Sequence, residues 1–204
     1  MKLANALTLI RALFAPVFFL IYFIPIWTNA FVFASGIIMI PLLACMDITD
    51  FFDGFFARKS KTVSDLGKMF DPFADVIVHL TTFTCFLYSC NSAFAPYTPI
   101  LIFIFILYRE FTQTFFRMLA AKQGVAIGAR KGGKFKTVLY VTTSFFCLFQ
   151  ECAVRIDFHP VLDKASQLKT ATLILFILCF IASYVSFLDY VLNFKSVIKH
   201  STKS

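Results

Sequence analysis

The chain has 204 residues, of which 59% are hydrophobic and 18% aromatic, and its mean hydropathy is +0.81. A soluble helical bundle would carry a wide polar stripe on each surface helix, and the apolar stretches of this sequence have none, which argues against that class. The formal net charge is +8, yet no basic helix or aromatic stacking surface accompanies it, which argues against nucleic-acid binding.

Six apolar stretches approach or exceed the roughly 20 residues that a helix needs to cross a bilayer. They lie at residues 6–27, 31–57, 69–90, 95–120, 137–153 and 170–194. We therefore predict an all-α integral membrane protein with six transmembrane helices and a single domain over residues 1–204. The first stretch lacks a signal-peptide cleavage site and carries Asn5 and Arg11, so we expect it to be retained.

The basic residues predict the orientation of these spans. An even number of spans puts both termini on one side of the membrane. The opposite side then holds only three of the 19 Lys and Arg residues, namely Arg155, Lys164 and Lys169. Because cytoplasmic loops carry the excess of Lys and Arg, we predict that both termini are cytoplasmic. The positive charge there suits anionic headgroups or phosphorylated substrates.

The second and third stretches carry a motif of acidic residues at the cytoplasmic side. It reads Asp50-Phe-Phe-Asp53-Gly54-Phe-Phe-Ala57-Arg58, followed by Gly67, Asp71 and Asp75. On helices, aspartates three or four positions apart share a face. Converging carboxylates repel one another unless cations lie between them, and hard ions such as Mg²⁺ take oxygen ligands while leaving room for phosphate. The motif therefore predicts a metal site that holds a phosphorylated substrate.

Small and basic residues accompany these carboxylates. Gly54 and Ala57 keep one helix face thin, so that either a flat ligand or a second helix can approach. Arg58 can bind a phosphate or anchor the helix end at the membrane interface. Asp47, one turn before Asp50, could support a metal ligand.

The polar break at residues 121–136 combines glycines with cations. Glycine lets a backbone approach a ligand closely, and cations contact phosphate. An ordinary basic loop of a membrane protein has the same composition, so charge alone leaves both interpretations open.

The aspartate motif resembles the signature of the CDP-alcohol phosphotransferase family at every fixed position. This resemblance implies two divalent ions, Mg²⁺ or Mn²⁺, that clamp the pyrophosphate of a CDP-linked substrate. It implies four metal ligands, the last of which also acts as general base: Asp50, Asp53, Asp71 and Asp75. It further implies a nucleotide pocket lined by Gly54, Ala57, Arg58 and Ser64.

The flanking segments resemble the phosphatidylglycerophosphate synthases of that family. The resemblance is carried by Asn5-Ala-Leu-Thr8-Leu-Ile-Arg11, Arg109-Glu110, Arg117 and the segment 132–137. It implies that Asn5 and Thr8 lie beside the CDP-lipid. sn-Glycerol 3-phosphate is a dianion, so its phosphate needs a second basic pocket, for which the candidates are Arg109, Arg117, Lys134 and Lys136. Val76 departs from the pattern, since many of these synthases carry lysine there.

The predicted reaction transfers the phosphatidyl group from CDP-diacylglycerol, which arrives from the bilayer, to sn-glycerol 3-phosphate. The products are phosphatidylglycerophosphate and CMP. The resemblance also implies a homodimer in the cell membrane, with the active site at the cytoplasmic face. Alternatives stay open: another acceptor of the family (inositol phosphate, serine, choline or a phospholipid), a small transporter, or a scaffold without activity. A neutral acceptor would not need the basic residues, and no pseudo-repeat or broken helix indicates a transporter.

The six cysteines are dispersed and lack the spacing of a zinc site. Buried small hydrophobic side chains are the simplest interpretation. Cys90 and Cys152 fall near the outer ends of their predicted spans. The sequence leaves open whether these two form a disulfide or stay free.

Overall fold

The structure, a computed structural model, describes residues 3–60, 65–122 and 131–201, and the side chains of residues 8–49, 73–120 and 132–192. Every regular element within those ranges is a helix, which confirms the predicted all-α class. The helices are α1 (Leu3–Thr28), α2 (Val32–Ser60), α3 (Asp65–Cys85), α4 (Ile100–Lys122), α5 (Lys131–Arg155), the short α6 (His159–Leu162) and α7 (Ala165–Ser201).

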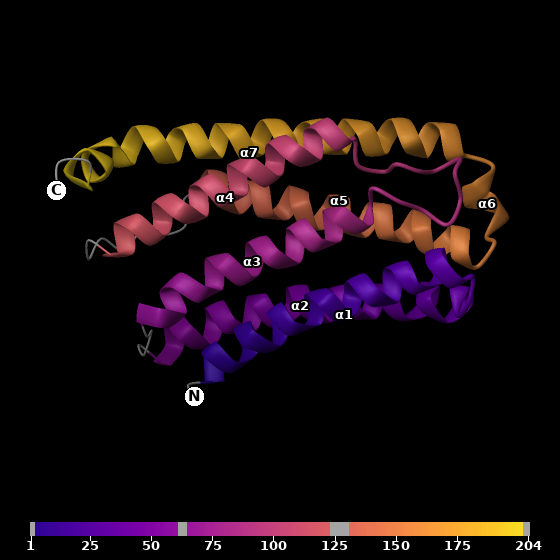
Figure 1. Ribbon diagram of the computed structural model, residues 1–204, viewed down its shortest axis with the longest axis horizontal. Coiled ribbons are helices and arrows are strands. Elements are labelled where there is room, and N and C mark those ends of the chain that lie inside the picture. The colour runs from indigo at the N-terminus through magenta and orange to yellow at the C-terminus, as the bar shows by residue number, and fades with distance from the viewer. Residues whose placement is uncertain (1–2, 61–64, 123–130, 202–204) are drawn as a thin grey trace.

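The long helices lie side by side in an elongated bundle (Figure 1). α1 packs against α2 and α3, α5 packs against α2 and α7, and α4 packs against α3 and α7. α1 begins and α7 ends at the same end of the bundle, which we call the terminal end. The α1–α2 connection, the segment 86–99 and α6 lie at the opposite end, which we call the turn end.

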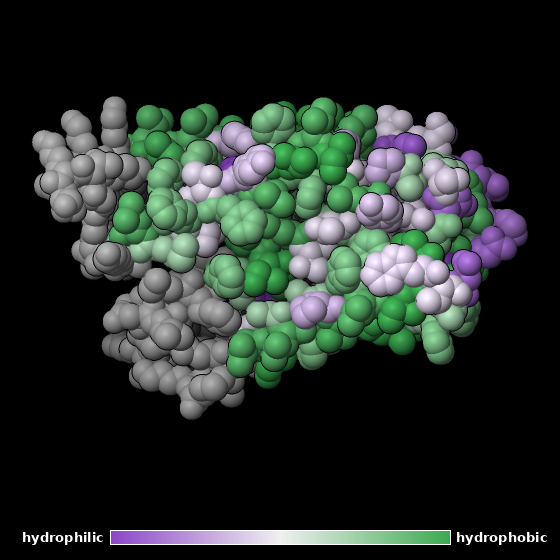
Figure 2. All heavy atoms as spheres, viewed as in Figure 1, coloured by the Kyte–Doolittle hydropathy of each residue, from purple (hydrophilic) through white to green (hydrophobic). Residues whose placement is uncertain are grey.

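Several helices have the length and composition of membrane spans. Among the described residues, four stretches are long and apolar enough to cross a membrane: Thr8–Thr28, Val32–Thr49, Gly132–Arg155 and Ala165–Leu192. α3 has a shorter apolar stretch, Phe73–Cys85. α4 is one continuous helix, but Arg109, Glu110 and Arg117 interrupt its apolar sequence. Apolar side chains cover the middle of the molecule, and hydrophilic ones gather at the turn end (Figure 2). An apolar outer surface of this kind suits contact with lipid.

Aromatic side chains fill the centre of the bundle. The ring centroid of Phe83 on α3 lies 5.1 Å from those of Tyr140 on α5 and Phe176 on α7. All three side chains are fully buried. Aromatic pairs of this kind contribute about 0.5–1.5 kcal/mol each beyond their buried area. The abundant phenylalanines therefore join helices to one another as well as facing lipid.

Three predicted boundaries are wrong. α5 begins at Lys131, so residues 131–136 are helical although we predicted a polar break there. Gly132 faces α7, where a Cβ added to it would lie in ordinary van der Waals contact with the Cα of Ser186, at 3.7 Å. α4 begins at Ile100 and not at residue 95, because the prolines at 96 and 99 lack backbone donors and disfavour helix before them. α3 ends at Cys85, before the turn that follows.

Candidate active site at the terminal end

The aspartate motif lies on two consecutive helices. Positions 50, 53, 54, 57 and 58 are within α2, and positions 71 and 75 are within α3. Because Ser60 ends α2 and Asp65 begins α3, the joined ends lie within about 18 Å of each other. Both aspartate pairs thus lie on continuous helices, as expected. The predicted site residues whose side chains fall outside the described residues are Asn5, Asp50, Asp53, Gly54, Ala57, Arg58, Ser64 and Asp71.

Asp75 is the aspartate of the motif whose side chain is described. Its Oδ1 atom lies 3.4 Å from Nη1 of Arg11 on α1, and its side chain is 35% exposed. At that length the hydrogen bond is weak, so much of the carboxylate stays accessible to a ligand. Thr8, one turn before Arg11, is buried in the same helix. No role was predicted for Arg11 from the sequence, although an arginine inside an apolar helix is itself a signal of function.

Glu110 organises the basic residues of α4 and α5. Its Oε1 accepts hydrogen bonds from Nη1 of Arg109 at 2.6 Å and from the hydroxyl of Tyr140 at 2.9 Å. Nζ of Lys136 donates to both carboxylate oxygens, at 2.9 and 3.1 Å. We call these four residues the Glu110 cluster. Arg109 and Lys136 were predicted as site residues from the sequence, but the carboxylate that joins them was not.

The Glu110 cluster and the aspartate motif lie close together. The Asp75 carboxylate interacts electrostatically with Lys136 and with Arg117. Arg117 also interacts with Glu110 and Arg109, so both arginines of α4 belong to the same charged region. The helices thus bring the last aspartate of the motif near two of the four residues predicted for the acceptor phosphate, Arg117 and Lys136.

Part of the Arg109 guanidinium makes no hydrogen bond to the described residues. Its Nε and Nη2 atoms are buried and have no hydrogen-bond partner among the described residues, and the same holds for Nε of Arg117. A buried donor without a partner costs about 1–3 kcal/mol. The fork of a guanidinium matches the oxygens of a phosphate or carboxylate. These donors therefore suit an anionic ligand that enters between the helices.

Lys134 differs from the other predicted acceptor residues. Its side chain is exposed on the first turns of α5. No ion pair joins it to another described residue, whereas Lys136 is paired with Glu110. Lys134 therefore faces outward, where it can meet headgroups or a ligand that approaches from outside.

The carboxylates of the motif fit hard divalent ions in their chemistry. Mg²⁺ and Mn²⁺ take carboxylate oxygens and share their remaining positions with substrate phosphate. Asp75 meets this requirement with a partly exposed carboxylate that accepts one weak hydrogen bond among the described residues. Among the described side chains, no three His, Cys, Asp or Glu residues gather as ligands. The other three predicted ligands lie outside that set.

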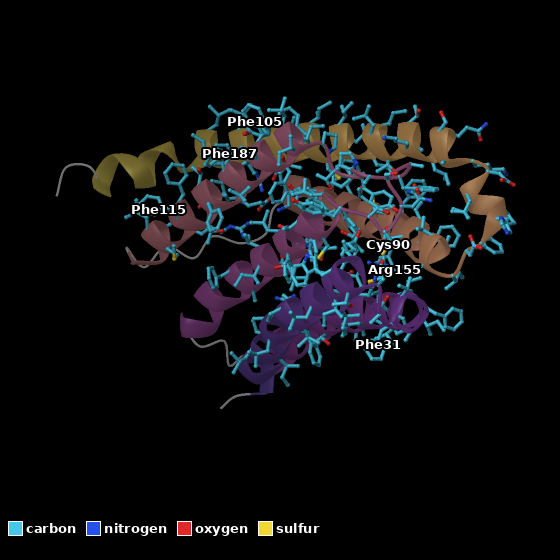
Figure 3. The ribbon with its side chains drawn as sticks, turned by 45° about the vertical axis from the view of Figure 1, so that its right-hand side comes forward. Phe31, Cys90, Phe105, Phe115, Arg155 and Phe187 are labelled. Carbon is cyan, nitrogen blue, oxygen red and sulfur yellow. The ribbon has the colours of Figure 1, made fainter. Side chains whose placement is uncertain are left out.

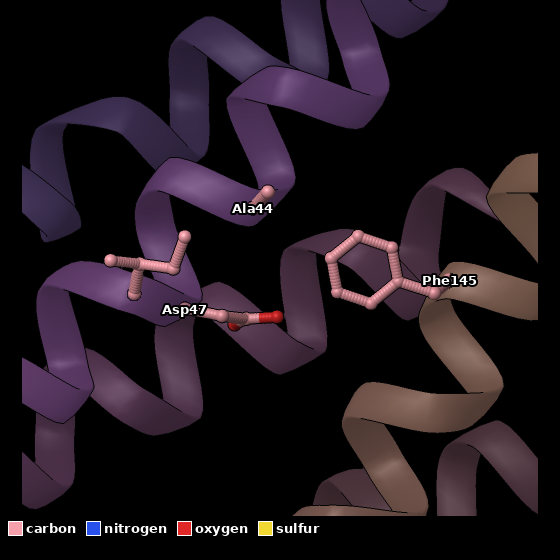
Figure 4. A pocket seen from close by; sticks show the side chains of 4 residues that line it. Ala44, Asp47 and Phe145 are labelled. Atoms are coloured by element: carbon pink, nitrogen blue, oxygen red, sulfur yellow. The ribbon is translucent and has the colours of Figure 1, made fainter.

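A groove opens between α2 and α5, one helical turn before the motif. Its volume is about 300 Å³, and it is lined by Ala44, Asp47, Ile48 and Phe145. Asp47 and the ring of Phe145 face each other across it (Figure 4). Apart from the one carboxylate, these walls are apolar, so the groove suits an alkyl chain more than a polar ligand.

A second polar cluster lies at the turn end, around an ion pair between two fully buried side chains of α5. Nε of Arg155 donates to Oε1 of Glu151 at 2.8 Å, and both side chains are 0% exposed. Nη1 of Arg155 donates to the hydroxyl of Ser35 on α2, and Nη2 donates to the carbonyl of Tyr22 on α1, each at 2.8 Å. The pair therefore joins three helices.

The segment 86–99 completes this second cluster. Glu151 accepts hydrogen bonds from the hydroxyls of Ser89 and Tyr97 and from the backbone N–H of Cys90. Burial and the Glu151 carboxylate raise the pKa of Tyr97, so its hydroxyl stays a donor. We call Glu151, Arg155 and these partners the Glu151 cluster; Figure 3 shows Arg155 and Cys90 close together. Cys90 and Cys152 both carry free thiols, which answers the disulfide question left open by the sequence.

Comparisons with known proteins give one consistent result. A sequence model of the family described as CDP-alcohol phosphatidyltransferase matches residues 1–199. A protein of Treponema pallidum is 31% identical over 98% of this chain and 92% of its own length. A protein of Aquifex aeolicus is 28% identical over 98% and 99%, and one of Bacillus subtilis is 31% identical over 80% and 85%. All three are named CDP-diacylglycerol–glycerol-3-phosphate 3-phosphatidyltransferase.

Proposed function

The chain belongs to the CDP-alcohol phosphatidyltransferase family, and we propose that it transfers the phosphatidyl group of CDP-diacylglycerol to sn-glycerol 3-phosphate. The products are phosphatidylglycerophosphate and CMP. The names of its relatives support this reaction. The observation that carries it is the electrostatic interaction of Asp75 with Lys136 and Arg117, together with the buried ion pairs that Glu110 makes with Arg109 and Lys136. It supports a motif that holds a diphosphate near a basic region suited to an anionic acceptor.

In the proposed reaction, a hydroxyl oxygen of the acceptor bonds to the β-phosphorus of CDP-diacylglycerol, and the bond from that phosphorus to the oxygen of CMP breaks. Asp75 takes the hydroxyl proton as general base. Arg11, which contacts one oxygen of Asp75, orients the carboxylate. Asp50, Asp53, Asp71 and Asp75 would hold two divalent ions, which when bound would neutralise the diphosphate and the charge of the leaving CMP.

The remaining predicted residues divide between the two substrates. We assign to the CDP-lipid Asn5, Thr8, Gly54, Ala57, Arg58 and Ser64. We assign to the acceptor phosphate Arg109, Arg117, Lys134 and Lys136. The buried, unpartnered nitrogens of Arg109 and Arg117 support the second assignment, because an acceptor without an anionic group, such as choline, would leave them unsatisfied.

We further propose that the protein is a single domain that spans the membrane six times, with both termini in the cytoplasm. The asymmetry of Lys and Arg supports this orientation, together with the common end at which α1 begins and α7 ends (Figure 1). It puts the active site at the cytoplasmic face of the cell membrane. The proposal includes a homodimer, which the family resemblance implies and which light scattering of the purified protein in detergent would test.

The groove between α2 and α5 supports access of the CDP-lipid from the side. Ala44, Ile48 and Phe145 give it apolar walls, and Asp50 follows Asp47 by one turn of α2. A lipid whose diphosphate sits at the motif can therefore leave an alkyl chain in this groove without extracting it from the bilayer.

Release of CMP tests the reaction. Purified protein should release CMP from CDP-diacylglycerol only when sn-glycerol 3-phosphate and Mg²⁺ or Mn²⁺ are present. A panel with inositol phosphate, serine, choline and phosphatidylglycerol should give little product by comparison. Release with another acceptor alone would reassign the substrate, and no release with any acceptor or metal would reject the enzyme and favour a transporter or scaffold.

A further inference from the structure

We propose that Glu110 is a positioning residue for the acceptor phosphate, which rests on the function proposed above. Its carboxylate holds Arg109 and Lys136 in one arrangement, in which the remaining donors of Arg109 stay available to the phosphate of sn-glycerol 3-phosphate. Glu110 does not touch the substrate, because its own charge would repel a dianion. It acts through the cations that it holds.

The charges of the cluster make this role necessary. Arg109 and Lys136 are two cations with side chains 1% and 13% exposed. Like charges at such depth repel strongly, and removing one partner of a buried pair costs about 3–5 kcal/mol. One carboxylate between two cations leaves a net charge of +1. The cluster is thus stable without substrate and still attracts an anion.

The geometry shows which donors remain. Lys136 donates to both oxygens of Glu110, so its ammonium group is paired mainly with this carboxylate. Arg109 gives Glu110 only Nη1, and its Nε and Nη2 stay without a partner among the described residues. The acceptor phosphate is therefore recognised chiefly through the free part of the Arg109 guanidinium.

The contacts around Arg109 restrict the orientation of its guanidinium. Adjacent residues on a helix do not normally face each other, so the 2.6 Å contact of Arg109 with Glu110 holds both side chains in one rotamer. The guanidinium also lies over the Phe187 ring of α7, 5.9 Å from its centroid. Tyr140 in turn holds Glu110 from α5. Loss of the carboxylate would free Arg109 to rotate.

The test is Glu110→Gln in the full-length protein, which keeps the shape of the side chain but removes its charge. The KM for glycerol 3-phosphate should rise at least about tenfold, the scale of one charge-assisted hydrogen bond. The inhibition constant of inorganic phosphate, used as a competitor, should rise by a similar factor. kcat and the KM for CDP-diacylglycerol should change by less than about threefold, because the substitution leaves the motif intact.

Glu151→Gln is the matched control, since it makes the same substitution at a buried glutamate of the turn end. It should lower the melting temperature without moving the KM for glycerol 3-phosphate. Tyr140→Phe is the second variant, which removes one hydrogen bond to Glu110 and keeps the ring contact with Phe83. It should raise the same KM about two- to fivefold, as expected for one neutral hydrogen bond.

The outcomes separate the two proposals. An active wild-type protein and a folded Glu110→Gln variant with an unchanged KM would overturn the role of Glu110 alone. If that variant does not fold, an unchanged KM in Tyr140→Phe overturns the role, and the predicted rise supports it. A wild-type protein that releases no CMP with glycerol 3-phosphate would instead reject the proposed function, and the role of Glu110 with it.

Discussion

The two buried polar clusters at opposite ends of the bundle are built from the same kinds of residue but are completed differently. Arg155, at the turn end, uses all three of its nitrogens within the protein, on Glu151, Ser35 and Tyr22. Arg109, at the terminal end, uses one nitrogen on Glu110, and its other two are buried without a partner among the described residues.

This difference separates structural charge from functional charge. A buried arginine whose donors are all satisfied joins helices and has nothing left to bind. A buried arginine with unsatisfied donors destabilises the free protein by about 1–3 kcal/mol per group. That cost is recovered only when a ligand supplies acceptors. The terminal end therefore has the character of a binding site, and the turn end that of a clamp.

The largest expected effect is that of Asp75→Asn. Loss of a general base lowers turnover by about 10²–10⁴-fold, and the loss should be at the upper end here because the same side chain is a proposed metal ligand. Thermal stability should stay within about 1 kcal/mol of wild type, because the Asp75 carboxylate is 35% exposed and its described hydrogen bond to Arg11 is long, at 3.4 Å. CMP release and melting temperature measure the two effects, and binding of CDP-diacylglycerol should largely survive. Full turnover in this variant would remove the base assignment.

Arg155→Met should have the opposite effect to Asp75→Asn: it should lower stability and leave activity unchanged. It leaves Glu151 buried without its cation, and breaking a buried pair in this way costs about 3–5 kcal/mol of stability. Both kcat and KM of the folded fraction, measured at low temperature, should match wild type. Thermal unfolding in detergent gives the stability. A large change in KM for either substrate, with stability intact, would contradict the assignment of this cluster as a clamp.

Among the basic residues of the terminal end, a more buried side chain should contribute more to binding of the acceptor. Arg109→Ala should raise the KM for glycerol 3-phosphate about 10–100-fold, because charged hydrogen bonds contribute about 1.5–3 kcal/mol. Lys134→Ala should raise it no more than about threefold, since exposed charges are screened. Steady-state kinetics with varied acceptor decide the order. Equal effects, or a larger one at Lys134, would move the acceptor pocket to the outer surface of α5.

Much of this fold follows from the sequence alone, because long apolar stretches form helices whatever their neighbours are. The exceptions are instructive. Residues 131–136 include three lysines and two glycines, and the sequence indicated a break, but α5 extends through them and packs at Gly132 against Ser186 of α7. Local composition contains no information about a contact with a residue more than 50 positions away.

The same limit applies to the sites. The spacing of the aspartates was readable because it lies within one short segment. The contact of Arg11 with Asp75 spans 64 positions, and that of Ser89 with Glu151 spans 62. Which buried charges pair depends on the faces that distant helices present to each other. For that reason, neither Glu110 as the centre of one cluster nor Glu151 as the centre of the other was predicted.

The smallest expected effect is at Cys90, whose backbone N–H donates to Glu151. The reactivity of its thiol tests whether the charge of Glu151 acts within the turn end. Burial raises the pKa of its thiol to about 11; the Arg155 guanidinium opposes this shift, and the Glu151 carboxylate adds to it. Only the thiolate reacts with maleimides or iodoacetamide. Near pH 8, labelling should therefore be about 100-fold slower than for a thiol of ordinary pKa, and the rate should rise with pH up to about 11.

Glu151→Gln should speed this labelling a few-fold at pH 8, because it removes a negative charge that disfavours the thiolate. The pKa should nevertheless stay above 9.0, the ordinary value, since burial is the largest cause of the shift. Mass spectrometry of a Cys45→Ala background, which removes the other exposed thiol, measures the rate at one site. An unchanged labelling rate in Glu151→Gln would mean that the charge of Glu151 does not influence the Cys90 thiol at the turn end. The contrast with the terminal end would then rest on hydrogen bonds alone.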